Sequence, residues 1–526
     1  MPEGFNITDK IEDAIADIRK EISGYPSLIA LDQQFATIPD KLHEPMQLAI
    51  VGKISSSKST LVNAILGEAE VVRTGAMEET WNVSWLKYGS PDAPIIVHYK
   101  DADRASEKVD RNEWANWANR HRDGNEQLKN AISWIEVTYP HPILQQINII
   151  DTPGLDSFVG IDSQNTIDFL RKVRPDAIVM LFSKNINENT LDEIRNFRQE
   201  VGAGFSPINA IGVLSKIDDF WNSDSDQEPI DEGNRIIESL MSQEIVKNTL
   251  FKIYPLSAWV ALSAYRINED DLSTFDQLQK LPQEVLNRLF KSAKRFVTDY
   301  PDVPVAGSRR AELSGIYGRY GIWLILEHLK NGGSATILDL HKLLLRKSGF
   351  DRFLEVLQNH FVQQAATIKV HSLIVWLSAE IRKTTNDYPA NAEERFVLGK
   401  IIRIMDDLVR MVKLQSNVID FAKEYYEGRL DLEPEEFEEL RRVNGEFGFS
   451  CIERTGLDAN ATPEEMIEMC SQRIRFWRIE LNTTGVSFPS LARFMKQMLA
   501  SYSVLSAEIV SAKHKLESSK NFLFGK

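Results

Sequence analysis

The chain has 526 residues, of which 43% are hydrophobic and 26% charged, and its formal net charge is -15. That length exceeds one ordinary hydrophobic core, so we expect two or more domains. An acidic surface repels nucleic-acid phosphates, and we therefore expect no nucleic-acid partner. The two cysteines, Cys451 and Cys470, lie in no metal-ligand motif, and the start of the chain shows no leader pattern. These features predict a cytoplasmic protein.

The N-terminal segment carries isoleucines at helical spacings of four and three residues. They are Ile7, Ile11, Ile15, Ile18 and Ile22. Such spacing places all of them on one apolar helix face, which must pack on other helices. We predict that residues 1–44 form a helical segment that joins a bundle built by the end of the chain.

From residue 46 the pattern changes to short apolar runs, each followed by a loop and a helical segment. The runs are 46–51, 147–150, 177–182 and 210–214. Repeated strand–helix units favour an α/β domain with a mostly parallel sheet and helices on both faces. We assign this domain to residues 45–362. Strand signals stop after Ala258, so residues from about 259 to 345 are interpreted as a helical insertion.

Residues 363–526 contain no strand pattern, and two long apolar seams predict an α-helical bundle stalk. The seams are Val397, Ile401, Ile404, Leu408, Met411, Val418, Ala422 and Tyr425, then Leu491, Phe494, Met498, Leu505, Ile509, Ala512 and Leu516. The apolar run 373–377 fits a buried helix better than a membrane contact. The acidic run 431–439 is interpreted as a solvated turn that leads into a helix.

The loop after the first apolar run has the composition of a phosphate-binding loop. Its nucleotide-binding candidates are Gly52, Ser55, Ser56, Ser57, Lys58, Ser59 and Thr60. Such a loop needs inward-pointing N–H groups, a lysine for the β- and γ-phosphates, and a hydroxyl for Mg²⁺. Lys58 and Ser59 stand at the expected spacing, whereas Ser57 replaces the usual glycine and can strain the turn. A serine-rich linker is the competing interpretation of this loop.

A second motif, Asp151-Thr152-Pro153-Gly154, follows the run 147–150. An aspartate at a strand end can hold Mg²⁺ through water, and the Gly154 N–H can bind a γ-phosphate. An ordinary turn would have the same sequence.

Two further motifs predict recognition of guanine. Ser215, Lys216 and Asp218 follow the run 210–214, and Ser257-Ala258 follows the run 251–254. An aspartate can accept from both N1–H and the exocyclic amine of guanine, a donor pair that adenine lacks, and a lysine stem can cover the base. A solvated Lys/Asp loop is the alternative. Four motifs in order, each after a strand, argue against coincidence and against an ATPase.

Together these motifs resemble the GTPase domain of dynamin-like proteins, most of all the bacterial ones, over roughly residues 46–361. Thr80 stands at the family's switch threonine, ahead of a strand that ends in Tyr88-Gly89. The resemblance implies GTP hydrolysis with Mg²⁺ held by Ser59, Thr80 and, through water, Asp151. It also implies catalytic roles for Lys58, Thr80 and Ser55, the last of which matches a serine that supports a monovalent cation.

Ile54 departs from the family, which often has a water-positioning glutamine at this place. The resemblance implies slow basal turnover that rises when heads dimerise, stalk movement, and membrane remodelling with peripheral membrane contact. The implied partners are guanine nucleotide and a second copy through the heads, or a hetero-oligomer. The alternative is a slow or non-hydrolysing switch or scaffold that acts through protein partners.

Overall fold

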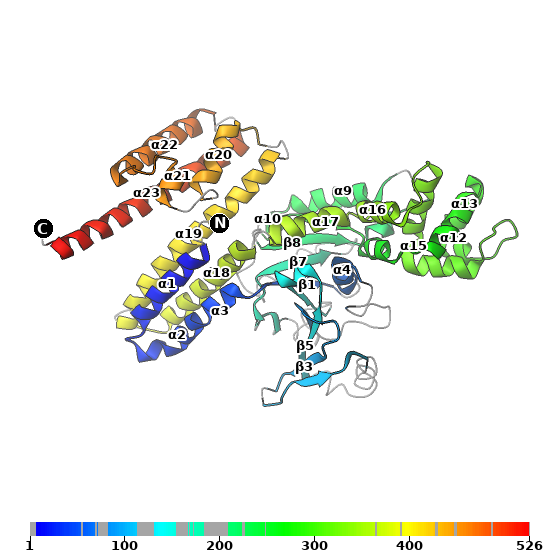
Figure 1. Ribbon diagram of the computed structural model, residues 1–526, viewed down its shortest axis with the longest axis horizontal. Helices are drawn as coiled ribbons and strands as arrows, with labels where there is room; N and C mark the ends of the chain where they lie inside the picture. The colour runs from blue at the N-terminus through cyan, green and yellow to red at the C-terminus, as the bar shows by residue number, and fades with distance from the viewer. Residues whose placement is uncertain are drawn as a thin grey trace. The chain divides into compact units, whose positions relative to one another are not determined.

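The computed structural model describes residues 7–53, 56–68, 71, 83–101, 103–112, 131–153, 167, 169–171, 173–182, 209–223, 227–247, 249–362, 365–389, 392–426, 430–445, 450–484 and 488–524. The chain divides into two compact units (Figure 1). One is Pro45–Ile368, and the other combines Met1–Glu44 with Lys369–Lys526.

The first unit is built on a nine-stranded sheet in the order β4-β3-β5-β2-β6-β1-β7-β8-β9. The strands are β1 Met46–Gly52, β2 Val83–Tyr88, β3 Ile95–Tyr99, β4 Glu107–Val109, β5 Ile132–Tyr139, β6 Ile147–Asp151, β7 Ala177–Phe182, β8 Ala210–Ser215 and β9 Ile253–Leu256. The block from β6 to β9 is parallel throughout. This arrangement confirms the predicted α/β class with a mostly parallel sheet.

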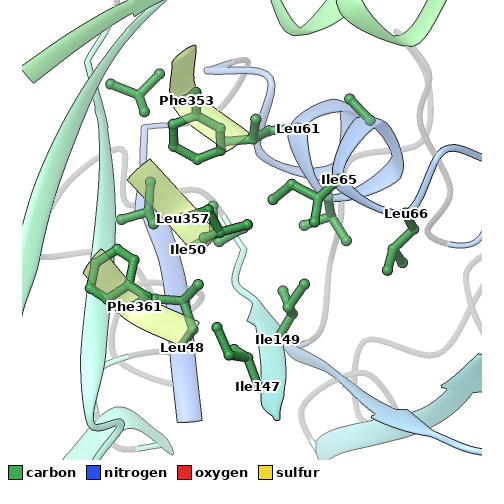
Figure 2. Close-up of a cluster of buried hydrophobic side chains, with 14 of the residues drawn as sticks. Leu48, Ile50, Leu61, Ile65, Leu66, Ile147, Ile149, Phe353, Leu357 and Phe361 are labelled. Carbon is green, nitrogen blue, oxygen red and sulfur yellow. The ribbon is translucent and has the colours of Figure 1, made fainter. Parts of the chain in front are cut away.

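Helices cover both faces of the parallel block, and the alternating side chains of β1 therefore belong to two different cores. Leu48 and Ile50 pack with α4 Lys58–Ile65, α11 Ala258–Ser263, α17 Phe350–Val356 and the π-helical turn η5 Leu357–Val362. Figure 2 shows Leu357 and Phe361 beside Ile50 and Leu48, and Phe353 beside Leu61 of α4. Ala49 and Val51 point the other way, toward α9 Pro229–Met241 and α10 Glu244–Lys247.

The sheet also has an extension that the apolar runs did not reveal. β2 runs antiparallel to β6, β5 is parallel to β2, and β3 is antiparallel to both β5 and β4. One face of this extension carries a small core that includes Val97 and Val137. Its other face holds half-buried Trp85 and Trp134, so these strands alternate apolar and polar residues instead of forming solid apolar runs.

The predicted helical insertion consists of several short helices and one long one. They are α12 Glu269–Gln279, α13 Gln283–Phe290, α14 Ala293–Val297, α15 Gly307–Lys330 and α16 Ile337–Lys347. The short turns η2 Pro142–Gln145, η3 Ile217–Phe220 and η4 Ala264–Arg266 complete the first unit. These insertion helices enclose a core of their own, centred on buried aromatic side chains such as Phe275, Phe290 and Tyr317.

The second unit is helical over its described residues. It contains α1 Ile7–Ile22, η1 Pro26–Leu28, α2 Ile29–Ala36, α3 Ile38–His43, α18 Ala365–Asn386, α19 Glu393–Tyr426, α20 Pro434–Val443, α21 Cys451–Thr455, α22 Pro463–Thr483 and α23 Pro489–Phe524. No described helix is long and apolar enough to cross a membrane. The fold class therefore includes the expected α-helical region.

The two chain ends pack in different cores of this unit, contrary to the single bundle that the seams suggested. α1 to α3 pack with α18 and the first half of α19. The rest of α19 packs with α20 to α23. The run 373–377 is mostly buried in the former core through Leu373, Ile374 and Leu377.

The acidic run 431–439 is only partly the solvated turn that we expected. It does lead into α20 through a capping box of Glu433 and Glu436. Glu439, however, is buried and accepts hydrogen bonds from Arg473 Nε and Tyr502 Oη, both at 2.6 Å. A carboxylate with such donors is an internal anchor of the helical core.

Candidate nucleotide-binding site

The predicted phosphate loop joins the end of β1 to the start of α4. β1 lies between β6 and β7, where the strand order of the sheet reverses, and ligands of open α/β sheets bind beyond the carboxyl ends of strands at such a point. A Cβ atom at position 52 would lie 2.7 Å from the Leu181 carbonyl oxygen and 2.9 Å from Ser56 Oγ. Gly52 is therefore required by the close approach of β7 and of the loop itself.

Lys58 is buried and folds back over the loop that precedes it. Its Nζ donates to the carbonyl oxygens of Gly52 at 3.1 Å and Lys53 at 2.8 Å. The ammonium group is thus held at the centre of the loop. A phosphate oxygen placed there would meet a fixed positive charge at little ordering cost.

Ser57 has φ 67 and ψ 30, the left-handed conformation that favours glycine. The strain that the sequence analysis anticipated is therefore present, at about 1–2 kcal/mol for a residue with a Cβ atom. The Ser57 carbonyl oxygen accepts from the Leu61 N–H at 2.9 Å, so this strained residue starts the first turn of α4.

The first and second motifs meet through Ser59 and Asp151. Ser59 Oγ donates to Asp151 Oδ2 at 2.6 Å, although the two residues are 92 positions apart. Burial raises the pKa of Asp151 to about 6, and the Ser59 hydrogen bond and the Lys58 charge oppose that rise. Beside them, Thr152 Oγ1 donates to the Ile50 carbonyl oxygen at 2.8 Å and fixes the turn to β1.

These groups fit a divalent cation. Asp151 Oδ1 is buried and has no hydrogen-bond partner among the described residues, and the same holds for Ser56 Oγ. A buried carboxylate oxygen without a partner is costly, and a hydrated Mg²⁺ held there would remove that cost. The donor set of one hydroxyl and one carboxylate leaves the remaining ligands to water and phosphate, as Mg²⁺ prefers.

The two guanine motifs also lie in contact. The Ser257 hydroxyl hydrogen-bonds the Asp218 carboxylate, which opposes the rise that burial causes in the pKa of Asp218. Ser257 Oγ also accepts from the Val260 N–H at 3.3 Å and caps α11, whose first residue is the buried Ala258. Asp218 is therefore oriented by the loop that would back the base.

The remaining residues of the third motif are fixed by the backbone. Ser215 is buried at the end of β8, and its Oγ donates to the Phe182 carbonyl oxygen at 3.0 Å. Lys216 adopts the left-handed conformation, with φ 59, at the start of η3. Thr60 is half-buried in the first turn of α4. Ile54, Ser55, Thr80 and Gly154 lie outside the described residues.

The geometry thus places Lys58, the Ser59–Asp151 pair and Asp218 at the carboxyl ends of strands of one parallel block. A family model described as the dynamin family matches residues 48–217, which cover the first three motifs. The match assigns residues 48–217 to the dynamin family.

Curated relatives agree with this assignment. The chain is 26% identical over 451 residues to the isoniazid-induced protein IniC of Mycobacterium tuberculosis, across 85% of this chain and 87% of IniC. It is 24% identical to dynamin-like protein 2 of Campylobacter jejuni, across 40% of this chain and 32% of that protein. A probable transmembrane FZO-like GTPase of Arabidopsis thaliana is 26% identical, across 49% of this chain and 24% of that protein.

Several residues around this dynamin-family site were not found from the sequence. Thr152 was quoted only as part of its motif, although its hydroxyl fixes the turn. Trp221, Glu228 and Lys347 belong to no motif and come from separate elements. The position of Trp221, three residues after Asp218, is the one signal that the sequence gives for any of these three.

Proposed function

We propose that this dynamin-like protein binds GTP with Mg²⁺ and hydrolyses it slowly, that two heads pair across the nucleotide, and that pairing moves the helical stalk at a membrane. The observation that carries the proposal is the Ser59–Asp151 pair, 2.6 Å apart, beside the buried Lys58 ammonium group. This arrangement supports a site for a metal-bound triphosphate, because a hydroxyl, a carboxylate and a fixed cation converge there.

Each proposed role follows from the position of the residue. Lys58 neutralises charge on the β- and γ-phosphates, and the backbone N–H groups from Gly52 to Thr60 surround them. Ser59 would hold Mg²⁺ and Asp151 would hold it through water, and the ion would supply charge neutralisation. Asp218 accepts from the guanine edge, the Lys216 stem covers the base, and the Ser257-Ala258 loop backs it.

Further roles rest on the resemblance alone. They assign Thr80 to Mg²⁺ and to the attacking water, Gly154 to the γ-phosphate, and Ser55 to a monovalent cation. Slow turnover is proposed because Ile54 can neither donate nor accept a hydrogen bond to position water. Pairing of two heads would then supply the water-positioning contact that a single head lacks.

A cluster of exposed apolar side chains supports the membrane part of the proposal. Phe476 and Ile479 are 40% and 61% exposed near the end of α22, and Phe488 is 55% exposed just before α23. Because α22 and α23 pack on each other, these side chains lie at one end of the pair, which we name the apolar tip patch. Arg475 and Arg478 are exposed beside it in a chain of net charge -15. Exposed apolar side chains with a cationic rim suit an anionic membrane surface.

The hydrolysis proposal is tested by measuring GTP turnover per head across a range of protein concentrations. We expect low turnover that rises with concentration, because pairing completes the site, and no turnover in Lys58→Met. Turnover that stays constant per head would contradict pairing. Turnover that Lys58→Met retains would contradict the assigned site.

The membrane proposal is tested by sedimentation with phosphatidylserine vesicles. Ile479→Asp should reduce binding, whereas Leu338→Asp is the matched control, since Leu338 is also 61% exposed but lies in the GTPase unit. Equal binding by both variants and the parent would exclude the apolar tip patch as the contact.

The alternative is a guanine-nucleotide switch or scaffold that does not turn over. The strained Ser57, with φ 67 at the entrance of α4, favours it, because the loop departs there from the usual glycine. Single-turnover measurements separate the two functions: bound GTP that stays intact while still changing the oligomeric state supports the switch.

A further inference from the structure

The guanine-recognition loop is packed against the helical insertion by one aromatic side chain. Trp221 follows η3, the turn that carries Asp218. Its ring centroid lies 5.9 Å from that of Phe290, 6.0 Å from Tyr320 and 5.7 Å from Trp323. All three partners belong to α13 and α15, so Trp221, three residues after Asp218, packs against the insertion's own core. Aromatic contacts of this kind hold a chain segment in one position.

A polar contact joins the same two parts a short distance along the chain. Glu228, which directly precedes α9, accepts from Lys347 Nζ at 2.6 Å and from Tyr320 Oη at 3.4 Å. Lys347 is the last residue of α16, and Tyr320 is buried in α15. The start of α9 is therefore tied to two helices of the insertion.

The helix that Glu228 precedes also holds the nucleotide loops. α9 packs on η3. A Cβ atom at Gly233 of α9 would lie 2.8 Å from Pro255 Cβ and 3.4 Å from Ile217 Cγ2. α9 therefore packs closely against both η3 and β9, the strand that leads to Ser257. A shift of α9 would therefore displace both elements.

The other side of the polar contact reaches the base-backing loop as well. Directly after Lys347, the Ser348 carbonyl oxygen accepts from the Ser257 N–H at 3.0 Å. The next residue, Gly349, has φ 77, and a Cβ atom there would collide with the Pro255 carbonyl oxygen. The end of α16 is thus fitted to the segment that orients Asp218.

We propose that Trp221 and Glu228 are positioning residues that hold the guanine-recognition loop against the helical insertion, so that the insertion sets how fast guanine nucleotide is released. The inference rests on the proposed function, because it concerns the regulation of the same nucleotide site. Asp218 must stand within a few tenths of an ångström of its place to accept two hydrogen bonds from guanine. A displaced insertion would move η3 and α9, and Asp218 with them.

The test compares Glu228→Gln with a matched control, Asp302→Asn. Asp302 is also a part-exposed carboxylate of the insertion region, bonded to Arg288 at 2.7 Å, but it lies far along the chain from the guanine loops. The release rate of fluorescent GDP is measured by stopped flow, together with the affinities for GDP and inosine diphosphate. Inosine lacks the exocyclic amine, so the ratio of the two affinities reports the geometry at Asp218.

We expect Glu228→Gln to release GDP about two- to fivefold faster, in keeping with the strength of a part-exposed ion pair. The preference for GDP over inosine diphosphate should narrow, and Asp302→Asn should change neither quantity. Lys347→Met should reproduce the effect from the opposite side. The double variant should release GDP no faster than either single variant, because both remove the same contact. Trp221→Leu should give a larger acceleration.

Two outcomes overturn the inference. In the first, Glu228→Gln matches Asp302→Asn while the parent protein still prefers GDP to ADP. In the second, Glu228→Gln lowers the unfolding temperature but leaves the release rate and the inosine ratio unchanged, which is a structural role only. A parent protein that shows no preference for GDP over ADP would instead reject the proposed function itself.

Discussion

The two sides of the nucleotide site differ in how completely the protein satisfies its own polar groups. On the phosphate side, Asp151 Oδ1 and Ser56 Oγ are buried without hydrogen-bond partners among the described residues, and Ser57 is strained. On the base side, the Ser215 hydroxyl is bonded to a strand carbonyl, and Asp218 is bonded to Ser257. Among the described residues, Ser215 and Asp218 on the base side therefore each have a hydrogen-bond partner, whereas two buried polar atoms on the phosphate side have none.

The difference indicates how each side contributes to binding. Buried polar atoms without partners raise the free energy of the empty site, and a ligand that bonds them recovers that energy. In the proposed site, a preorganised Asp218 carboxylate would mainly reject bases that cannot satisfy it. We therefore expect substitutions on the phosphate side to lower affinity for every nucleotide, and substitutions on the base side to change which nucleotide is preferred.

The largest effect should come from Lys58→Met. Methionine has a similar length but removes the ammonium group that now donates to the Gly52 and Lys53 carbonyl oxygens. Hydrogen bonds to a charged group contribute about 1.5–3 kcal/mol each, so GDP affinity should fall at least about a hundredfold. Calorimetric titration measures it. A Lys53→Met variant, which leaves the Lys58 ammonium group in place, is the control, and a small effect of Lys58→Met would mean that the loop does not bind phosphate.

The next largest effect should come from Asp218→Asn, and it should be selective. An amide cannot accept from both N1–H and the amine of guanine, so GDP affinity should fall about tenfold to a hundredfold. Xanthosine diphosphate carries a carbonyl in place of the amine, and the amide can donate to it. We expect the variant to prefer xanthosine diphosphate in competition assays.

Asp218→Asn and Lys58→Met should differ in one respect. The affinity that Asp218→Asn loses for GDP should return when xanthosine diphosphate is used, whereas Lys58→Met should bind both nucleotides weakly. If Asp218→Asn weakens guanine and xanthine nucleotides alike, the base side does not act through selectivity.

Ser59→Ala should have a smaller effect that depends on the metal. The variant loses the hydroxyl that bonds Asp151 at 2.6 Å and that is assigned to Mg²⁺. GDP affinity in Mg²⁺ should fall about tenfold, the value of one lost hydrogen bond beside a charge. In EDTA the parent and the variant should bind alike. A loss of equal size under both conditions would show that Ser59 acts on the loop and not on the metal.

Much of the parallel sheet was predictable because its strands are buried on both faces and form solid apolar runs. Ser59 and Asp151 were found as parts of separate motifs, and neighbouring parallel strands bring them together because β1 pairs with β6. In the strand extension only β2 was expected, through the resemblance, and β3 to β5 were missed because half-buried residues such as Trp134 break the apolar runs.

The contacts behind the guanine loop were out of reach of sequence reasoning for a different reason. Glu228 and Lys347 are 119 residues apart and belong to no motif, and only the tertiary fold brings the end of α16 within bonding distance of the residue before α9. Glu439 was likewise misread as solvated because its acidic neighbours are, while its donors Arg473 and Tyr502 come from other helices.

The smallest effect expected is that of Ser57→Gly, and it tests whether strain on the phosphate side is real. A Cβ atom in the left-handed region costs about 1–2 kcal/mol, whereas glycine loses about 0.5–1 kcal/mol through the greater freedom of the unfolded chain. The free energy of unfolding of the GTPase unit should therefore rise by about 0.5–1 kcal/mol. Thermal unfolding of the nucleotide-free protein measures this change, followed at the transition that added GDP shifts.

Ser57→Ala is the matched control, because alanine keeps the Cβ atom and the strain while losing only the hydroxyl. If alanine stabilises the unit as much as glycine does, then the serine hydroxyl and not the backbone conformation is the source of the cost. The phosphate side would then differ from the base side only in its unpaired polar atoms.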